Sequence, residues 1–237
     1  MKKHIPNTIT MLNLFSGCIA ITMAFLGNFE GVLIWIIMAA VFDFFDGFAA
    51  RLLHVSSPMG KELDSLADVV SFGIAPSAAV YVLLRDFTAY PDFLLPLSPY
   101  LAYSAFLIPV FSALRLAKFN LDERQSTHFI GMPTPANALF WISYCCGILS
   151  VPPLQNGLFY ITLFFILALS LLMVSEIPMF SLKLKKLSLK GNELQGILIV
   201  LMIGFVLLWG ILGIATGILA YIALSVIGYI RERKKHI

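Results

Sequence analysis

The chain has 237 residues, of which 59% are hydrophobic and 12% are charged, with a formal net charge of +3. Soluble globular domains carry about 25% charged residues, so this composition excludes a water-soluble protein. The three cysteines and four histidines have neither metal-ligand spacing nor the pattern of a disulfide framework. We therefore predict an all-α integral membrane protein, with residues 1–237 forming one polytopic domain and no nucleic-acid partner.

Eight apolar segments are long enough to cross a bilayer as helices, which takes about 20 residues each. The first follows Lys2 and Lys3, as in a signal peptide, but Pro6 and Asn13 interrupt it. We interpret it as an uncleaved first helix. The sequence thus predicts a helix bundle with about eight transmembrane helices, at residues 10–28, 31–51, 64–84, 97–116, 134–152, 157–175, 194–212 and 214–230.

Lysine and arginine are enriched in the cytoplasmic connections of membrane proteins. With a cytoplasmic N-terminus and eight crossings, 15 of the 16 lysines and arginines fall on the cytoplasmic side, and only Arg85 falls outside. Both termini are therefore predicted to be cytoplasmic, in a multi-pass protein of the cell (inner) membrane.

In the first helix, "PNTIT" opens the apolar run, and Asn13 and Gly17 follow within it. We expect Asn13 and Gly17 to serve close packing, although Asn13 could instead face a ligand.

The second and third segments carry four aspartates at their predicted cytoplasmic ends. Asp43 and Asp46 are three apart and share a helix face, and Asp64 and Asp68 are four apart and share a face of the next helix. If the two helices pair antiparallel through residues 52–63, the four carboxylates converge. Unpaired, they would repel one another, whereas hard cations such as Mg²⁺, Mn²⁺ or Ca²⁺ would hold them. Such a cluster has room for two ions, an arrangement that serves phosphoryl transfer.

The residues between these acids suit phosphate binding. Gly47 and Gly60 allow a ligand to approach the backbone closely, and the Arg51 guanidinium matches phosphate oxygens. Ser57 and Pro58 mark a helix start, where free amides attract anions. The alternatives are that Ser57 is only a helix cap and that Arg51 is only one of the positive charges that set the orientation in the membrane.

The spacing Asp43-x2-Asp46-Gly47-x2-Ala50-Arg51-x8-Gly60-x3-Asp64-x3-Asp68 resembles the signature of the CDP-alcohol phosphotransferase family of membrane enzymes. Members transfer a phosphoalcohol from a CDP-linked donor to a hydroxyl acceptor and release CMP. The resemblance implies a bundle of membrane helices, often a homodimer, with a cytoplasmic site for two divalent metal ions, Mg²⁺ or Mn²⁺.

The resemblance also implies roles for individual residues. Asp68 would be a metal ligand and the general base, and the other ligands would be Asp43, Asp46 and Asp64. An Asn-x-x-Thr element at the head of the first helix is matched by Asn7 and Thr10. The residues expected to bind the CDP-linked donor are Asn7, Thr10, Gly47, Arg51, Ser57 and Gly60.

Within the family, residues 5–21 ("IPNTITMLNLFSGCIAI"), 115–120 ("RLAKFN") and 129–138 ("FIGMPTPANA") resemble the bacterial membrane-embedded phosphatidylserine synthases. This implies CDP-diacylglycerol and L-serine as substrates. We hypothesise that Arg115, Lys118 and Asn120 bind serine; alternatively, Arg115 and Lys118 extend to lipid phosphates. The resemblance covers about the first 140 residues, so the helices from about residue 157 are expected to be peripheral.

Two other functions remain open from the sequence. Another member of the family, such as a phosphatidylglycerophosphate synthase, would share the aspartate signature. Carboxylates within membrane helices also line cation or proton pathways. Transport is disfavoured because the acids lie together at the predicted cytoplasmic ends of two helices, whereas a transport pathway needs polar groups across the depth of the membrane.

Overall fold

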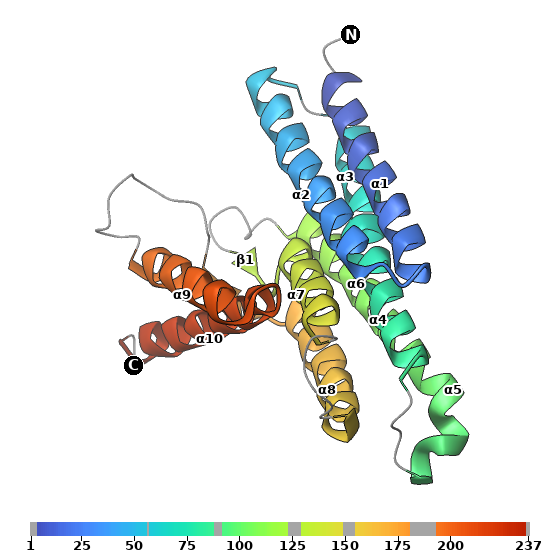
Figure 1. Cartoon of the computed structure of the whole chain (residues 1–237). Coiled ribbons are helices and arrows are strands. Elements are labelled where there is room, and N and C mark those ends of the chain that lie inside the picture. The colour runs from blue at the N-terminus through green and yellow to red at the C-terminus, as the bar shows by residue number, and fades with distance from the viewer. Residues whose placement is uncertain are drawn as a thin grey trace.

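The computed structural model describes residues 4–55, 57–87, 92–122, 129–148, 155–180 and 193–235 (Figure 1). The predicted all-α class is confirmed, since helices make up most of these residues. Several charges used to predict the orientation lie outside the described residues, namely Lys2, Lys3, Arg124, Lys183, Lys185, Lys186 and Lys190.

The elements follow one another along the chain with short connections. The α-helices are α1 (His4–Phe25), α2 (Phe29–Leu52), α3 (Pro58–Asp68), α4 (Ala75–Arg85), α5 (Ser98–Leu101), α6 (Leu107–Leu121), α7 (Thr134–Ile148), α8 (Gln155–Val174), α9 (Glu193–Trp209) and α10 (Leu212–Lys235). A π-helix, η1 (Val69–Ile74), joins α3 to α4, and the 3₁₀-helices are η2 (Asp92–Leu97) and η3 (Ala102–Phe106). Strands β1 (Phe129–Ile130) and β2 (Pro178–Met179) pair antiparallel.

Six helical stretches among the described residues are long and apolar enough to cross a membrane. The chain is therefore a polytopic helical membrane protein. Each of the eight predicted segments overlaps a helix, but α7 and α9 are shorter than those six stretches. The six are His4–Phe25, Phe29–Leu52, Pro58–Arg85, Ala102–Leu121, Gly157–Val174 and Leu212–Ile230.

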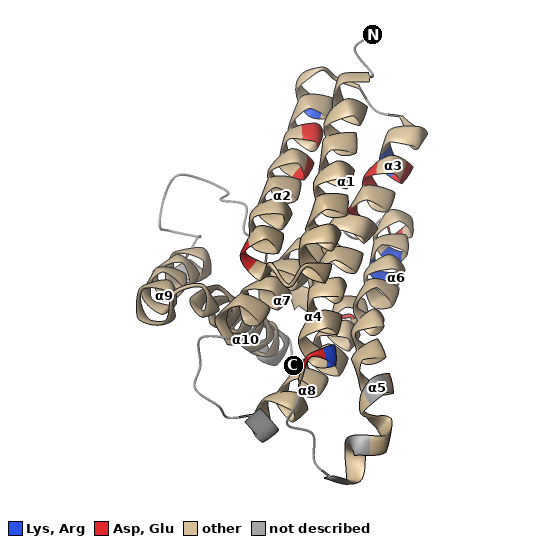
Figure 2. Cartoon of the chain, turned by 45° about the vertical axis from the view of Figure 1, so that its right-hand side comes forward, with Lys and Arg blue, Asp and Glu red and all other residues tan. Residues whose placement is uncertain are grey.

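Helix α1 lies between α2 and α3 and packs along both (Figure 2). The convergence of the acids was predicted on the condition that the second and third helices pair with each other. Within the described residues α2 and α3 make little direct contact, and both pack against α1 instead. The buried face of α1 carries small side chains, including Ser16, Gly17, Ala20 and Ala24. Small residues let membrane helices approach closely, so α1 can serve as the common wall for both neighbours.

Local sequence signals fix where these helices begin and end. Gly27, with a φ of 70°, follows α1, and the side chain of Asn28 accepts a hydrogen bond of 2.8 Å from the Gly31 N–H to cap α2. Ser57 caps α3 in the same way through the Gly60 N–H at 3.0 Å, and Pro58 takes the first helical position. The predicted helix start at Ser57 and Pro58 is therefore confirmed.

The C-terminal half is anchored by the short sheet and by the turn before α7. The Gly131 N–H donates to the Ile177 carbonyl at 2.9 Å, and the Met132 N–H donates to the Leu172 carbonyl at 3.2 Å. Gly131 has a φ of 74°, and a Cβ there would overlap the Met173 carbonyl oxygen. These bonds hold the start of α7 against the end of α8. Helices α9 and α10 pack together, and in Figure 1 they run across the direction of α1 and α2.

Candidate active site

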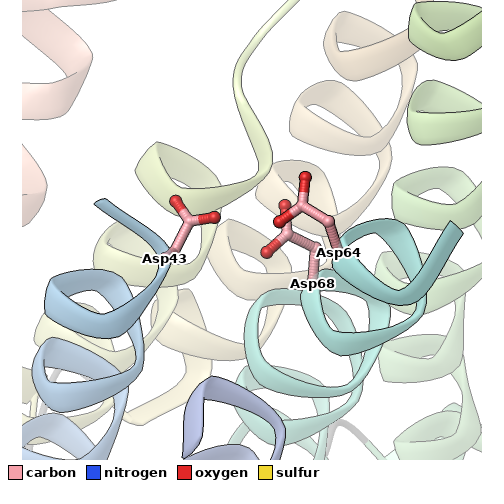
Figure 3. A group of neighbouring side chains, drawn as sticks. All are labelled: Asp43, Asp64 and Asp68. Atoms are coloured by element: carbon pink, nitrogen blue, oxygen red, sulfur yellow. The ribbon is translucent and has the colours of Figure 1, made fainter. Parts of the chain in front are cut away.

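Three of the four predicted carboxylates converge at one place in the bundle (Figure 3). Asp43 comes from α2, and Asp64 and Asp68 come from successive turns of α3. One oxygen from each lies within 4.8 Å of the others. The spacing of four residues places Asp64 and Asp68 on one face of α3, and the packing of the helices brings Asp43 of α2 to that face.

Asp46, the fourth acid, is held by α1 instead. The Thr10 hydroxyl donates a hydrogen bond of 2.7 Å to Oδ2 of Asp46, and both residues are buried. The described site thus has a group of three carboxylates with Asp46 beside it, where the sequence predicted one group of four. The reason is that α1 lies between the two acid-bearing helices and offers its own donor to Asp46.

The three-carboxylate group fits a divalent cation. Its ligands are hard oxygen donors, which Mg²⁺, Mn²⁺ and Ca²⁺ prefer. Asp64 Oδ1 is buried and has no hydrogen-bond partner among the described residues, which leaves it available as a ligand. Facing carboxylates at this separation repel one another unless a positive charge compensates them, so a bound cation would stabilise this arrangement.

A pocket of about 260 Å³ adjoins the carboxylate group. It is bounded by the first turns of α1, the last turns of α2 and the start of α3. Five of the six residues predicted to bind the donor line it, together with two of the acids and four further residues. The lining comprises Pro6, Asn7, Thr10, Asp46, Gly47, Ala50, Val55, Ser57, Gly60, Lys61 and Asp64.

The two signature glycines differ in how closely their surroundings approach. A Cβ on Gly60 would lie 3.0 Å from Ser57 Oγ and 3.2 Å from Asn7 Oδ1, closer than ordinary van der Waals contact. A Cβ on Gly47 would lie 3.5 Å from a terminal nitrogen of Arg51, one turn further along α2. Arg51, the sixth predicted donor residue, therefore lies next to Gly47, although it is not part of the pocket lining.

The structure adds Lys61 to the residues at this pocket. From the sequence it was expected only at the cytoplasmic ends of the second and third helices, near the aspartates and Arg51, with no role of its own. Its Nζ donates a 2.8 Å hydrogen bond to the Asn120 carbonyl, which ties the start of α3 to the end of α6.

The three residues predicted to bind serine have different surroundings. Arg115 is only 7% exposed, its Nε has no hydrogen-bond partner among the described residues, and its guanidinium interacts electrostatically with Asp68. Lys118 Nζ instead donates to the Val174 carbonyl at 3.0 Å, and Asn120 Nδ2 donates to Ser65 Oγ at 2.7 Å. Of the three, Arg115 is the one with an electrostatic interaction with a carboxylate of the group, Asp68.

Comparison with known proteins decides the family. The model of the family described as CDP-alcohol phosphatidyltransferase matches residues 3–229. The chain belongs to this family. The resemblance seen in the aspartate signature is thereby confirmed.

Similar curated proteins carry the name CDP-diacylglycerol–serine O-phosphatidyltransferase. The chain is 39% identical to that of Bacillus subtilis over 132 residues, which cover 56% of this chain and 70% of the relative. It is 34% identical to that of Mycobacterium leprae over 187 residues, or 74% of this chain and 57% of the relative. The chain is 34% identical to the protein of the same name from Helicobacter pylori over 192 residues, which cover 78% of this chain and 75% of the relative.

In this CDP-alcohol phosphatidyltransferase, the pocket and the carboxylate group meet at Asp64, which belongs to both. A ligand bound in the pocket is therefore placed beside the group that fits a cation. An anionic ligand such as a pyrophosphate would gain from the cation and from the free amides at the start of α3.

Proposed function

We propose that this protein transfers the phosphatidyl group from CDP-diacylglycerol to the hydroxyl of L-serine, which gives phosphatidylserine and CMP. The observation that carries the proposal is the shared position of Asp64, which joins a pocket lined by family-signature residues to three facing carboxylates. The names of the similar proteins support serine as the acceptor.

The pocket would hold the CDP part of the donor. Its lining includes Asn7 and Thr10 from α1, together with Gly47, Ser57 and Gly60. The amides at the Ser57-capped start of α3 and the Arg51 guanidinium would receive the pyrophosphate. The diacylglycerol tails would remain in the bilayer, where the outer face of α2 presents three exposed side chains, Phe44, Phe45 and Phe48.

The acids would hold the family's divalent metal. Asp43, Asp64 and Asp68, with Asp46 beside them, would bind Mg²⁺ or Mn²⁺, and we propose two ions. When bound, these ions would neutralise negative charge on the phosphoryl oxygens and on the departing CMP.

Asp68 would act as the general base. It accepts the proton of the serine hydroxyl as that oxygen forms a bond to the phosphorus esterified to diacylglycerol. The bond from this phosphorus to the CMP oxygen breaks, and CMP leaves with the electron pair. Asp68 is 8% exposed, so the proton moves within a site from which bulk water is largely excluded.

Arg115 would bind the serine carboxylate. Its buried guanidinium, with Nε unpartnered among the described residues and Asp68 nearby, can receive an anion next to the base. Arg115→Ala should raise KM for serine about 10-fold or more, the cost of losing a charge-assisted hydrogen bond, with KM for CDP-diacylglycerol unchanged. Lys118→Ala is the matched control, because Lys118 is engaged with α8. Equal rises in both KM values for Arg115→Ala would contradict the assignment.

The remaining parts of the proposal concern the cellular setting. We propose that the site faces the cytoplasm from the inner membrane, that all eight segments span it, and that the protein is a single-domain homodimer. The distribution of lysine and arginine supports the orientation, and one family match over residues 3–229 supports the single domain.

The deciding experiment uses the purified full-length protein with CDP-diacylglycerol. Serine, glycerol 3-phosphate and inositol are offered in turn, with and without EDTA, and lipid product and CMP are measured. We expect phosphatidylserine and CMP with serine only, and none with EDTA until Mg²⁺ or Mn²⁺ is restored. Product with glycerol 3-phosphate alone would identify a phosphatidylglycerophosphate synthase instead. Full activity in EDTA would refute the metal site.

A further inference from the structure

One face of α1 contacts two acids of the site, Asp46 and Asp68, and the segment that follows Asp68. Residues 10, 13 and 17 are spaced by three and four and therefore share this face. Thr10 donates to Asp46 at 2.7 Å, and Asn13 Nδ2 donates to Asp68 Oδ1 at 3.3 Å. At Gly17, a Cβ would overlap Ser71 Oγ and would lie 2.8 Å from Ser71 Cα.

Asn13 is buried below the pocket and has an incomplete set of hydrogen bonds. It is 0% exposed, and its Oδ1 has no partner among the described residues. The described pocket lining includes Asn7 and Thr10 from α1 but not Asn13, so the sequence-based alternative that Asn13 faces the nucleotide is not supported. Its side-chain amide is directed to Asp68 instead.

This arrangement costs stability, which argues against a purely structural role for Asn13. A buried polar atom left unpaired costs about 1–3 kcal/mol, and an apolar residue would pack α1 without that cost. A buried unpaired group in a native protein calls for an explanation, and a catalytic role is one of them.

The segment that carries Asp68 is fixed to Asn13 a second time. Asp68 is the last residue of α3, and the π-helix η1 begins at the next residue. Within η1, the Ser71 hydroxyl donates a hydrogen bond of 3.0 Å to the Asn13 backbone carbonyl. Single turns of π-helix are frequent at functional sites. The backbone and the side chain of Asn13 thus both hold the stretch that carries the proposed base.

We propose that Asn13 is a positioning residue of the transfer reaction, whose side-chain N–H fixes the orientation of the Asp68 carboxylate. The inference rests on the proposed function, because it assigns Asn13 a task through Asp68. By occupying one oxygen of Asp68, Asn13 sets the direction from which the other oxygen meets the acceptor hydroxyl.

The test compares Asn13→Ala and Asn13→Asp with wild type in the full-length protein. Misplacing a catalytic group by about 1 Å can cost about 100-fold in rate, so we expect kcat to fall about 10- to 100-fold in both. KM for CDP-diacylglycerol and for serine should stay within about 2-fold, since Asn13 contacts neither proposed binding region. Asn13→Asp keeps the shape but replaces the N–H donor with oxygen, so it should not restore kcat.

Ser16→Ala is the matched control on the same helix. Ser16 is 1% exposed and its hydroxyl bonds only the Leu12 carbonyl of its own helix, at 2.8 Å, among the described residues. It should keep wild-type kcat, and the melting temperature of Asn13→Ala should not fall below that of Ser16→Ala.

Three results would overturn the role of Asn13: wild-type kcat in Asn13→Asp, a loss of kcat matched by Ser16→Ala, or a parallel rise of both KM values. Should Asn13→Ala not fold, Asn13→Asp alone decides. The proposed function is judged separately, on whether the wild-type protein makes phosphatidylserine. If wild type uses another acceptor, the same comparison is made with that acceptor.

Discussion

Asp64 and Asp46 show how neighbouring acids of one signature come to occupy different surroundings. Asp64 lies in the three-carboxylate group and in the pocket, with one buried oxygen unpartnered among the described residues. Asp46 lines the same pocket but is bound by the Thr10 hydroxyl. The first environment suits a metal ligand. The second suits a carboxylate that is held in place by the protein before any ligand binds.

Replacing Asp64 or Asp68 with asparagine should abolish transfer. The amide removes a negative charge from the metal site, and in Asp68→Asn it also removes the proposed base, so kcat should fall at least about 1000-fold. CMP release from CDP-diacylglycerol and serine measures this loss. The control is Asp86→Asn, because Asp86 is exposed and paired with Arg85 at 2.7 Å after the end of α4. Activity above about a tenth of wild type in either variant would argue against the assigned roles.

Gly60→Ala should weaken donor binding. The added methyl group would press on Ser57 Oγ and Asn7 Oδ1 at 3.0 and 3.2 Å and would reduce the space in the pocket. We expect KM for CDP-diacylglycerol to rise about 10-fold, equivalent to about 1.4 kcal/mol, with less change in KM for serine. Gly157→Ala is the control, because a Cβ there meets nothing within 4 Å. An unchanged donor KM in Gly60→Ala would count against the pocket as the CDP site.

At the scale of elements, α1 organises the site, although the signature lies on α2 and α3. It packs along both helices and contributes Thr10 to Asp46 and Asn13 to Asp68. The acids of α2 and α3 therefore face each other beside a pocket that α1 also lines. A pocket of this kind can admit a ligand, whereas two directly packed helices would fill it with side chains.

Two helix caps make a matched pair for testing the start of α3. Ser57 caps α3 and lines the pocket, whereas Asn28 caps α2 at its other end, away from the pocket lining. Ser57→Ala and Asn28→Ala should each cost about 0.5–2 kcal/mol of stability. Only Ser57→Ala should also raise KM for CDP-diacylglycerol. Thermal unfolding in detergent and steady-state kinetics measure the two effects, and a donor KM that changes equally in both variants would leave Ser57 as a cap alone.

At the scale of the whole molecule, charge is unevenly distributed along the bundle. Most charged residues of α2, α3 and α6 lie toward one end, while Glu30 lies in the first turn of α2 and the pair Arg85 and Asp86 lies at the end of α4 (Figure 2). The described acids of the site belong to the first group. This distribution places the chemistry where a soluble amino acid and a membrane lipid can both reach it.

Cysteine labelling tests the orientation. In a background without Cys18, Cys145 and Cys146, single cysteines replace Glu62 near the start of α3 and Asp86 just after α4. Both native residues are exposed. With the site facing the cytoplasm, a membrane-impermeant maleimide should label the Asp86→Cys variant in intact cells and the Glu62→Cys variant only after lysis. The opposite pattern would reverse the orientation.

Most of the fold class and the family could be predicted from the sequence because both depend on local patterns. Apolar runs of about 20 residues indicate membrane helices in any tertiary context, and Ser57 with Pro58 indicates the start of α3 through bonds made within one turn. That Asp64 and Asp68 share one helix face follows from helical geometry alone. These predictions needed no knowledge of which helices are neighbours.

Such local patterns do not predict which helices are neighbours in space. The sequence by itself determined the helical membrane class, the acidic signature and most of the signature residues that line the pocket, because helical period and hydropathy act over neighbouring residues. Only the tertiary structure decided that α1 separates α2 from α3, that Thr10 binds Asp46, and that Arg115 rather than Lys118 approaches Asp68. These contacts join residues distant in sequence, so they depend on how the helices pack together. For α2 and α3, the small side chains of α1 allow that close packing.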